Sequence, residues 1–336
     1  MKSFMHPIFA AVTVATLAYG VAHAQTKEVT IGYQDMLDPY RIAQESKELE
    51  KATGYKINWK QFGGGGEVIK AMASGAVQVG EVGSAGIAAA VSRGEPYELF
   101  WILDDIGDAE ALVAKNGSGI NSVADLKGKK IAVPYNSTTH FHTMVALEQA
   151  KVNPADVQIL NMRPPEVRAA WQRGDIQATF IWDPVLAEVK KDGKVIISSG
   201  KISADTGKAT FDGYIVNKDW AKDNKDFMVK FVKVLASSDE KYRANKAKWT
   251  ADSPEVKAVA KWSGAKPEDV PAGMALYRFP TLGEQMSKWL GGGKDSTAAK
   301  ALAATAAFQL SQKQVEKTLP DYSVVVNPTY VQEAAK

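Results

Sequence analysis

Short runs of β-branched and aromatic residues alternate with amphipathic stretches along most of the chain. In its first part, apolar runs at residues 29–33, 56–62, 77–80, 97–103 and 111–115 predict strands, and stretches near 40–53, 67–74 and 87–92 predict helices. Strands that alternate with helices in this way indicate an α/β fold with mainly parallel sheets.

A second set of elements follows a Gly/Ser-rich turn at residues 116–119. Strands are expected at 130–134, 157–161, 178–182 and 194–198, and helices at 139–150 and 165–173. Residues 205–211 are typical of a polar return segment, 214–216 predict another strand, and the remainder is mostly helical. We therefore expect the chain to cross between two lobes near 116–120 and 200–212. One lobe then comprises residues 25–117 and 212–336, and the other residues 118–211.

The N-terminus has the pattern of a secretory signal peptide. Lys2 precedes an apolar run at residues 8–21, and the small-x-small pattern Ala22-His23-Ala24 follows. This run is shorter than the roughly 20 residues that cross a bilayer, although an uncleaved anchor helix is the alternative. We expect residues 1–24 to be removed, with cleavage before Gln25, and the mature chain to be periplasmic. A lipid anchor is not expected, because the chain has no cysteine.

Composition narrows the partners and the chemistry. The 336 residues include 41 Lys and Arg against 38 Asp and Glu, without a dense basic block, so no nucleic acid or anionic membrane surface is expected as a partner. The absence of cysteine excludes disulfides and thiolate nucleophiles. His140 and His142 lie two apart on a predicted helix and face different sides, so we expect solvent or capping roles rather than a metal site. Asp104 and Asp105 are expected to be solvated, and no cofactor is indicated.

Four turns between a strand and a helix are rich in small or hydroxyl residues or in proline, at residues 63–66, 83–86, 136–139 and 163–165. Turns of this kind meet at the carboxyl ends of strands, where α/β proteins bind ligands. Free amides at a helix N-terminus attract anions. The alternative is that the glycines make tight turns and the hydroxyls cap helices. The glycine spacing does not match a nucleotide-binding loop, so a small anion is expected.

Aromatic and acidic residues stand next to these turns. Tyr33 and Gln34 end the first strand, Glu110 precedes a strand, Trp182 ends another, and Asp212 lies at the second crossing. An aromatic wall and an acid opposite an anion site would suit a short ligand with a cation at one end and an anion at the other.

Several motifs together resemble the taurine-binding periplasmic proteins of ABC importers, within the wider sulfonate/nitrate/taurine-binding family. They are IGYQ at 31–34, AVQVG at 76–80, GDAEALV at 107–113, SVADLKGKKIAVP at 122–134, STTH at 137–140, WQRGDI at 171–176 and PDY at 320–322. The 122–134 stretch is shared across that wider family, whereas STTH with WQRGDI is more specific to the taurine group. The resemblance covers nearly the whole mature chain. Two departures from many relatives are Ala85, where a hydroxyl is lost, and Arg163, where a cation is gained.

The resemblance implies a type II periplasmic binding fold, with two α/β lobes that close over a ligand. It implies a monomeric receptor that captures taurine or a close aliphatic sulfonate for a membrane permease with a cytoplasmic ATPase, without a reaction of its own. Amides and hydroxyls would hold the sulfonate, Glu110 in preference to Asp212 the ammonium, and Trp182 and Tyr33 the carbons. The expected ligand-binding set is Tyr33, Gln34, Gly64, Gly83, Ser84, Glu110, Ser137, Thr138, Thr139, His140, Trp182 and Asp212. Nitrate, an aromatic sulfonate or a thiamine precursor are alternative ligands, and an enzyme on the same fold is the alternative function.

Overall fold

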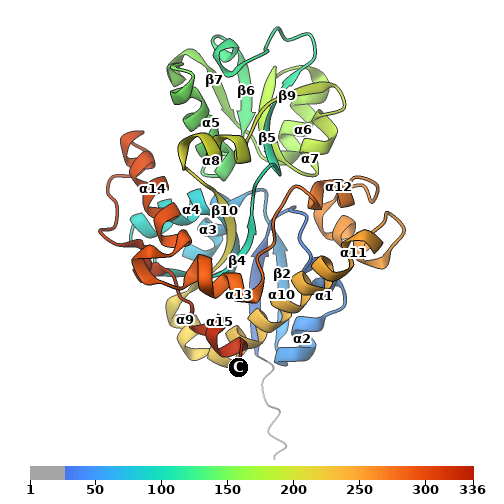
Figure 1. Ribbon diagram of the computed structural model, residues 1–336, viewed down its shortest axis with the longest axis vertical. Coiled ribbons are helices and arrows are strands. Elements are labelled where there is room, and N and C mark those ends of the chain that lie inside the picture. Colours follow the sequence, from blue (N-terminus) through green and yellow to red (C-terminus); the bar gives the residue numbers. More distant parts are fainter. Residues whose placement is uncertain (1–26) are drawn as a thin grey trace, which may run out of the picture.

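Two β-sheets, each covered by helices, form two lobes that lie one above the other in Figure 1. The computed structural model describes residues 27–336, so the expected signal peptide and its cleavage site lie outside the described residues. In this range the sheets have the strand orders β2-β1-β3-β10-β4 and β7-β6-β8-β5-β9. The two-lobed α/β fold is thereby confirmed. Within the same range, no helix is both long and apolar enough to cross a bilayer.

The two sheets have the same plan. In the first sheet β1, β2 and β3 are parallel, and β10 is antiparallel to β3 and β4. In the second sheet β6, β7 and β8 are parallel, and β5 is antiparallel to β8 and β9. The strands are β1 (Glu28–Tyr33), β2 (Lys56–Gln61), β3 (Val79–Gly83), β4 (Tyr97–Asp105), β5 (Glu110–Lys115), β6 (Lys130–Val133), β7 (Gln158–Asn161), β8 (Ala178–Trp182), β9 (Gly193–Ser198) and β10 (Phe211–Asn217).

Helices cover both sheets and bury their central strands. All residues of β3 and β8 are buried, as expected for strands covered on both faces. The second lobe carries α5 (Thr138–Gln149), α6 (Pro164–Arg173), α7 (Val185–Val189) and α8 (Ser199–Thr206). The first lobe carries α1 (Arg41–Glu45), α2 (Glu48–Thr53), α3 (Gly65–Ala73), α4 (Ser84–Ser92), α9 (Lys218–Asp223), α10 (Lys225–Asn245), α11 (Pro254–Ser263), α12 (Val270–Met274), α13 (Leu282–Glu284), α14 (Thr297–Ser311) and α15 (Thr329–Ala334). On α10, Phe227, Phe231 and Leu235 form the expected buried stripe.

The first crossing between the lobes lies earlier in the chain than expected. β5 pairs with β8 and β9 of the second sheet, so the chain leaves the first lobe at residues 106–109, and the boundary after residue 117 is wrong. The turn at 116–119 looks like a linker because Gly117 and Gly119 have positive φ, but it lies within the second lobe. Glu110 therefore belongs to the second lobe, opposite Asp212 in the first.

Three local expectations also need correction. Residues 199–206 form helix α8, so the polar return segment shrinks to residues 207–210. The expected helix at 40–53 is two helices, because Lys47 adopts a left-handed conformation with φ 56°. Helices α3 and α4 begin at Gly65 and Ser84, earlier than expected, so their first turns contain the small residues themselves.

Candidate functional site

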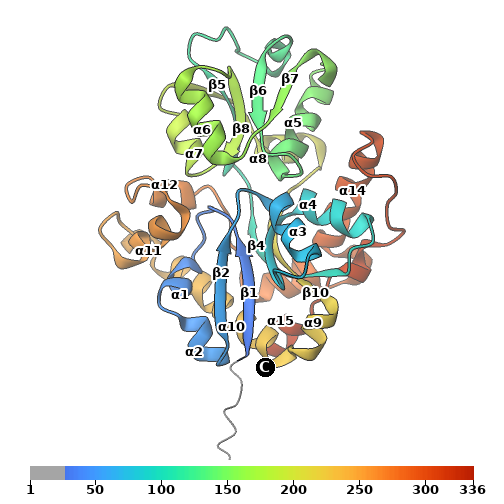
Figure 2. The same cartoon turned by 180° about the vertical axis from the view of Figure 1, so that it is seen from behind.

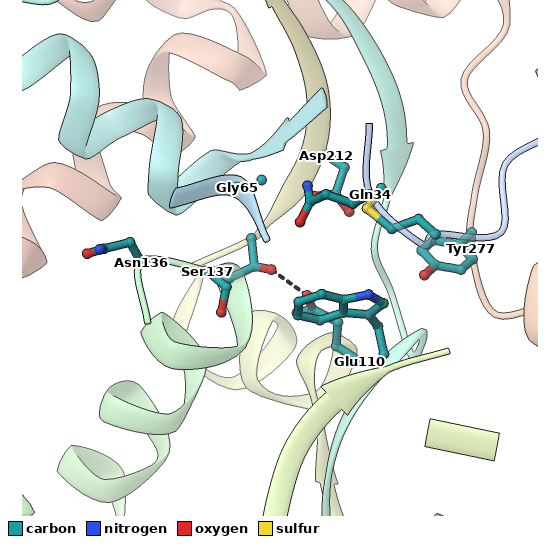
Figure 3. A pocket seen from close by; sticks show the side chains of 11 residues that line it. Gln34, Gly65, Glu110, Asn136, Ser137, Asp212 and Tyr277 are labelled. Atoms are coloured by element: carbon teal, nitrogen blue, oxygen red, sulfur yellow. Dashed lines mark hydrogen bonds between the residues drawn. The ribbon is translucent and has the colours of Figure 1, made fainter. Parts of the chain in front are cut away.

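A small cavity lies between the lobes. Both lobes contribute to it, and Figure 3 shows Gly65 and Asn136 at one side and Tyr277 at the other. The lining residues are Gln34, Met36, Gly65, Gly83, Glu110, Asn136, Ser137, Thr138, Trp182, Asp212 and Tyr277. Of the expected set, Gln34, Gly83, Glu110, Ser137, Thr138, Trp182 and Asp212 are thus brought together.

Three helices begin at this cavity. Gly64 and Gly83 are the N-caps of α3 and α4 and offer no capping side chain, whereas the Ser137 side chain caps α5 by accepting from the His140 amide at 3.1 Å. The first amides of each helix have no partner within the helix and give its N-terminus a partial positive charge. Gly83 also permits close approach of the lobes, because a Cβ there would lie 2.9 Å from Cγ2 of Thr138. The arrangement can hold an anion through backbone groups.

The hydroxyls at the start of α5 already have partners in the protein. Ser137 Oγ donates to the Pro134 carbonyl oxygen at 2.6 Å, and Thr138 Oγ1 donates to Glu110. The capping role considered for this turn is therefore present. Asn136 lies at the edge of the cavity, with its exposed side chain directed away from it in Figure 3. Its left-handed backbone, with φ 62°, turns the chain into the helix.

Glu110 is buried and held by two hydroxyl groups. One carboxylate oxygen accepts from Thr138 and the other from Ser199 Oγ at 3.0 Å. Burial raises the pKa of Glu110 to about 7, and the two hydrogen bonds partly oppose this rise. Because strand β5 and helix α8 both belong to the second lobe, these contacts fix Glu110 within that lobe at the floor of the cavity.

Asp212 faces the same cavity from the first lobe and receives no hydrogen bond from the residues that the structure describes. It is 5% exposed. Burial is the main cause that raises its pKa well above the ordinary aspartate range, followed by the charges of Glu110, Asp38 and Glu81. An unpartnered carboxyl group in this position can accept a cationic group of a ligand.

Further acids surround the cavity on the first-lobe side. Asp104 is fully buried rather than solvated, because it lies near the end of β4 and pairs with Asp212 on the neighbouring strand β10. Both of its carboxyl oxygens lack partners among the described residues. Arg41 is also fully buried and pairs with Asp38 and Glu81, each at 3.2 Å. Its guanidinium donates to the Gln34 carbonyl oxygen at 2.7 Å. The charge of Arg41 is thus balanced locally, and it anchors the end of β1.

The aromatic wall consists of Trp182 and a residue that the sequence analysis missed, Tyr277. The Trp182 indole donates to Asp35 in the first lobe at 2.8 Å. Tyr277 follows α12, and Met36 lies two residues beyond Gln34. Met36 could have been recognised from the sequence because it lies shortly after strand β1. No motif or spacing in the sequence indicates Tyr277 as a cavity residue.

The other expected residues do not line the cavity. Tyr33 packs edge-on against Trp59 and Trp262 and beneath Arg41. Ser84 and Thr139 make contacts within the protein. Ser84 Oγ accepts from the Phe211 amide, and Thr139 Oγ1 lies 2.8 Å from Ser137 Oγ. His140 stacks on Tyr135, with ring centroids 4.4 Å apart, and Gly64 lies beside the cavity as a helix cap.

Two further expectations concern His142 and Arg163. His142 is fully buried and not solvated, because α8 packs over it: its Nδ1 lies 2.8 Å from Ser199 Oγ and its Nε2 lies 2.9 Å from the Lys208 carbonyl oxygen. Burial lowers its pKa to about 4. Arg163 does not line the cavity but pairs with Glu166 on the exposed start of α6. Its added charge is therefore absent from the cavity wall.

A protein-family model and a sequence relative that match this chain both represent periplasmic binding proteins. The family described as "ABC transporter, phosphonate, periplasmic substrate-binding protein" matches residues 42–251. The taurine-binding periplasmic protein of Escherichia coli K12 is 34% identical over 95% of this chain and 97% of its own length.

Two solved structures have the same fold. The alkanesulfonate-binding protein of Xanthomonas axonopodis pv. citri, bound to MOPS, has a TM-score of 0.72 at 23% identity, and covers 90% of this chain and 97% of its own. The periplasmic aliphatic sulphonate-binding protein of Escherichia coli has a TM-score of 0.69 at 22% identity, and covers 90% and 99%. With its two-lobed fold, its cavity between the lobes and these relatives, the chain belongs to the family of periplasmic substrate-binding proteins of ABC transporters.

Proposed function

We propose that this protein captures taurine, or a close aminoalkanesulfonate, in the cavity between its lobes. The observation that carries the proposal is the placement of three helix N-termini against an unpartnered carboxyl group within one small cavity. The 34% identical relative from Escherichia coli K12 is a taurine-binding periplasmic protein, which supports the same ligand class.

The helix N-termini would bind the sulfonate. A sulfonate is anionic at physiological pH and has three acceptor oxygens, so amides at the starts of α3, α4 and α5 can share it. Each such terminus contributes about 0.3–1 kcal/mol when exposed and about 2 kcal/mol when partly buried, so several are needed.

The ammonium group would bind on the acidic side. The structure favours Asp212 over Glu110 as its direct partner, because both oxygens of Glu110 already accept hydroxyl hydrogen bonds and Asp212 has none. Trp182 and Met36 would pack on the two carbons between the charged ends. This assignment reverses the preference for Glu110 drawn from the sequence.

Titration calorimetry of the mature protein with taurine, ethanesulfonate, sulfate and nitrate tests the proposal. Taurine should bind most tightly, and Asp212→Asn should weaken taurine far more than ethanesulfonate, because leaving a buried charge unpaired costs about 2–5 kcal/mol. Asp105→Asn, one residue from Asp104 on β4 and partly exposed, is the matched control and should leave the ratio unchanged. Tighter binding of ethanesulfonate would replace the zwitterion with a simple alkanesulfonate, and binding of nitrate alone would overturn the sulfonate class.

The proposal extends to delivery and cellular location. We propose that the protein is exported, cleaved before Gln25, monomeric, and passes its ligand to a membrane permease with a cytoplasmic ATPase without transforming it. Family membership and the sequence of the first 24 residues support this proposal. Mass spectrometry of a periplasmic extract should find Gln25 at the N-terminus, and intact Met1 in the membrane fraction would contradict export. Recovery of chemically altered taurine after incubation would contradict a binding role without catalysis.

A further inference from the structure

Two aspartates face each other across neighbouring strands beside the cavity. Asp104 on β4 and Asp212 on β10 are direct partners in the antiparallel register. Directly opposed residues project to the same face of a sheet, with Cβ atoms about 4.5–5.5 Å apart. Asp104 is fully buried and both of its oxygens lack a partner among the described residues. Asp212 is the member of the pair that reaches the cavity.

The charged side chains that act on Asp104 and Asp212 are all acidic. They are Glu110 on β5, Asp105 on β4, Glu81 on β3 and Asp38 after β1, while burial and then the charges of both aspartates raise the pKa of Tyr277. Arg41 is already paired with Asp38 and Glu81, and Lys288 and Arg278 act on Asp105. Two buried carboxylates this close cannot both ionise without a cation. In agreement, burial raises the pKa of both well above the ordinary range, and the charge of Asp212 adds to the rise at Asp104.

We propose that Asp104 and Asp212 share one proton in the unliganded protein, and that the ammonium group of the ligand takes the place of this proton. The inference rests on the proposed function and deepens it: the preferred substrate class is a zwitterion with a protonated primary amine. The ammonium keeps its three protons, and the shared proton leaves the carboxyl pair for the solvent. Asp104 acts as a positioning residue, since it sets the charge state of Asp212 without lining the cavity.

Proton counting tests the inference directly. Taurine is titrated into the mature protein by calorimetry at pH 7.5 in phosphate and in Tris, where a primary alkylammonium remains protonated. The difference in heat between buffers gives the protons released, and linkage predicts roughly one per taurine bound. Ethanesulfonate, which carries no cation, should release none. Equal heats for taurine in both buffers would overturn the inference.

Variants assign the released proton to the pair. In Asp104→Asn the amide can donate to Asp212 in place of the shared proton, which favours the ionised form of Asp212, so proton release should fall while taurine still binds. Asp105→Asn makes the same chemical change at the next residue, which is partly exposed and lies within 4.0 Å of Arg278, and should keep the wild-type count. Glu110→Gln tests the nearest rival source. Loss of release in Glu110→Gln with retention in Asp104→Asn would overturn the inference.

A measurement on the unaltered protein tests the inference even if these variants fail to fold. If the pair gives up a proton, taurine affinity should rise about tenfold per pH unit between pH 6 and 7.5, whereas ethanesulfonate affinity should not rise. A flat taurine profile would overturn the inference. Failure of both ligands to bind at any pH would instead overturn the proposed function, so the two outcomes are distinct.

Discussion

At the scale of single residues, hydrogen bonds from hydroxyl groups such as that of Thr138 stabilise the buried carboxylate of Glu110. Thr138, at the first position of α5, donates its hydroxyl to Glu110, and Ser199 donates from α8. A hydrogen bond to a charged group contributes about 1.5–3 kcal/mol, so each hydroxyl offsets part of the cost of burying the carboxylate. The pair therefore matters most when Glu110 is ionised.

We predict that Thr138→Val destabilises the unliganded protein more at pH 8 than at pH 5. The folded-state pKa of Glu110 is about 7, above its ordinary value of 4.5, so the group is mostly protonated at pH 5 and ionised at pH 8. Loss of one donor to the ionised form should lower the free energy of unfolding by about 1.5–3 kcal/mol at pH 8. Urea unfolding at the two pH values measures the difference.

Thr143→Val is the matched control for this change. Thr143 lies on the same helix and is buried, but its hydroxyl donates to the Thr139 carbonyl oxygen at 2.8 Å rather than to a carboxylate. Its effect on stability should be the same at both pH values. A pH-independent loss for Thr138→Val as well would show that Glu110 does not depend on this hydroxyl.

Sequence reasoning located residues at the ends of strands. Gln34 follows β1 and Trp182 ends β8, so both lie at the carboxyl ends of parallel strands. Glu110 and Asp212 lie at the starts of the antiparallel strands β5 and β10, which reach the same cavity. Tyr277 was not predicted as a cavity residue, because its position depends on the packing of α12 and no local sequence pattern indicates this packing. The burial of Asp104 was not predicted, because a charged residue at a strand end is normally solvated. Asp104 is buried because its strand pairs with β10, which is distant in the sequence.

At the scale of elements, the starts of α3, α4 and α5 meet because glycine leaves room between the lobes. Gly83 has φ −69° and ψ 151°, a conformation open to any residue, so its value here is space rather than backbone freedom. A Cβ at this position would lie 2.9 Å from Thr138 Cγ2 and 3.0 Å from Asp212 Oδ1. Both of these neighbours line the cavity.

We predict that Gly83→Ala weakens taurine binding at least tenfold with little loss of stability. The added methyl group separates the lobes at the cavity, and overpacking of this kind costs about 1–3 kcal/mol. Gly66→Ala on α3 is the control, because its Cβ would lie 3.6 Å from the nearest atoms, an ordinary contact. Calorimetry with thermal unfolding distinguishes the effects, and equal taurine affinity for both variants would show that close approach at Gly83 is unimportant.

Most of the elements could be predicted, but their assignment to lobes could not be predicted fully. The apolar runs that became β1, β6 and β8 were located within a few residues, because buried strands are distinctive in sequence. β5 was placed in the wrong lobe, because strand pairing depends on partners distant in the sequence. The break between α1 and α2 was missed for a different reason: Lys47 adopts positive φ without being glycine or asparagine.

At the scale of the whole molecule, the ion pairs between the lobes are weak. In residues 27–336 two ion pairs connect them, Lys191 with Asp269 at 3.3 Å and Arg163 with Glu67 at 4.0 Å, and all four side chains are at least partly exposed. Exposed ion pairs contribute about 0–1 kcal/mol. Buried contacts between the lobes include the hydrogen bond from Trp182 to Asp35 and the edge-on packing of Phe141 against Phe308. A ligand that binds both lobes can therefore determine whether they are closed.

We predict that taurine compacts the protein in solution. The two crossing segments, residues 106–109 and 207–210, allow the lobes to move apart, and the proposed ligand contacts Asp212 from one lobe and the start of α5 from the other. Because a ligand shifts such an equilibrium only by its differential affinity for the two states, saturating taurine should favour the closed form that binds both of its ends. Small-angle X-ray scattering should show a smaller radius of gyration with taurine than without. Asp212→Asn at the same taurine concentration should show little compaction, since it lacks the first-lobe partner of the ammonium group. An unchanged radius for the unaltered protein, at an occupancy verified by calorimetry, would place the ligand within one lobe and remove the hinge from the mechanism.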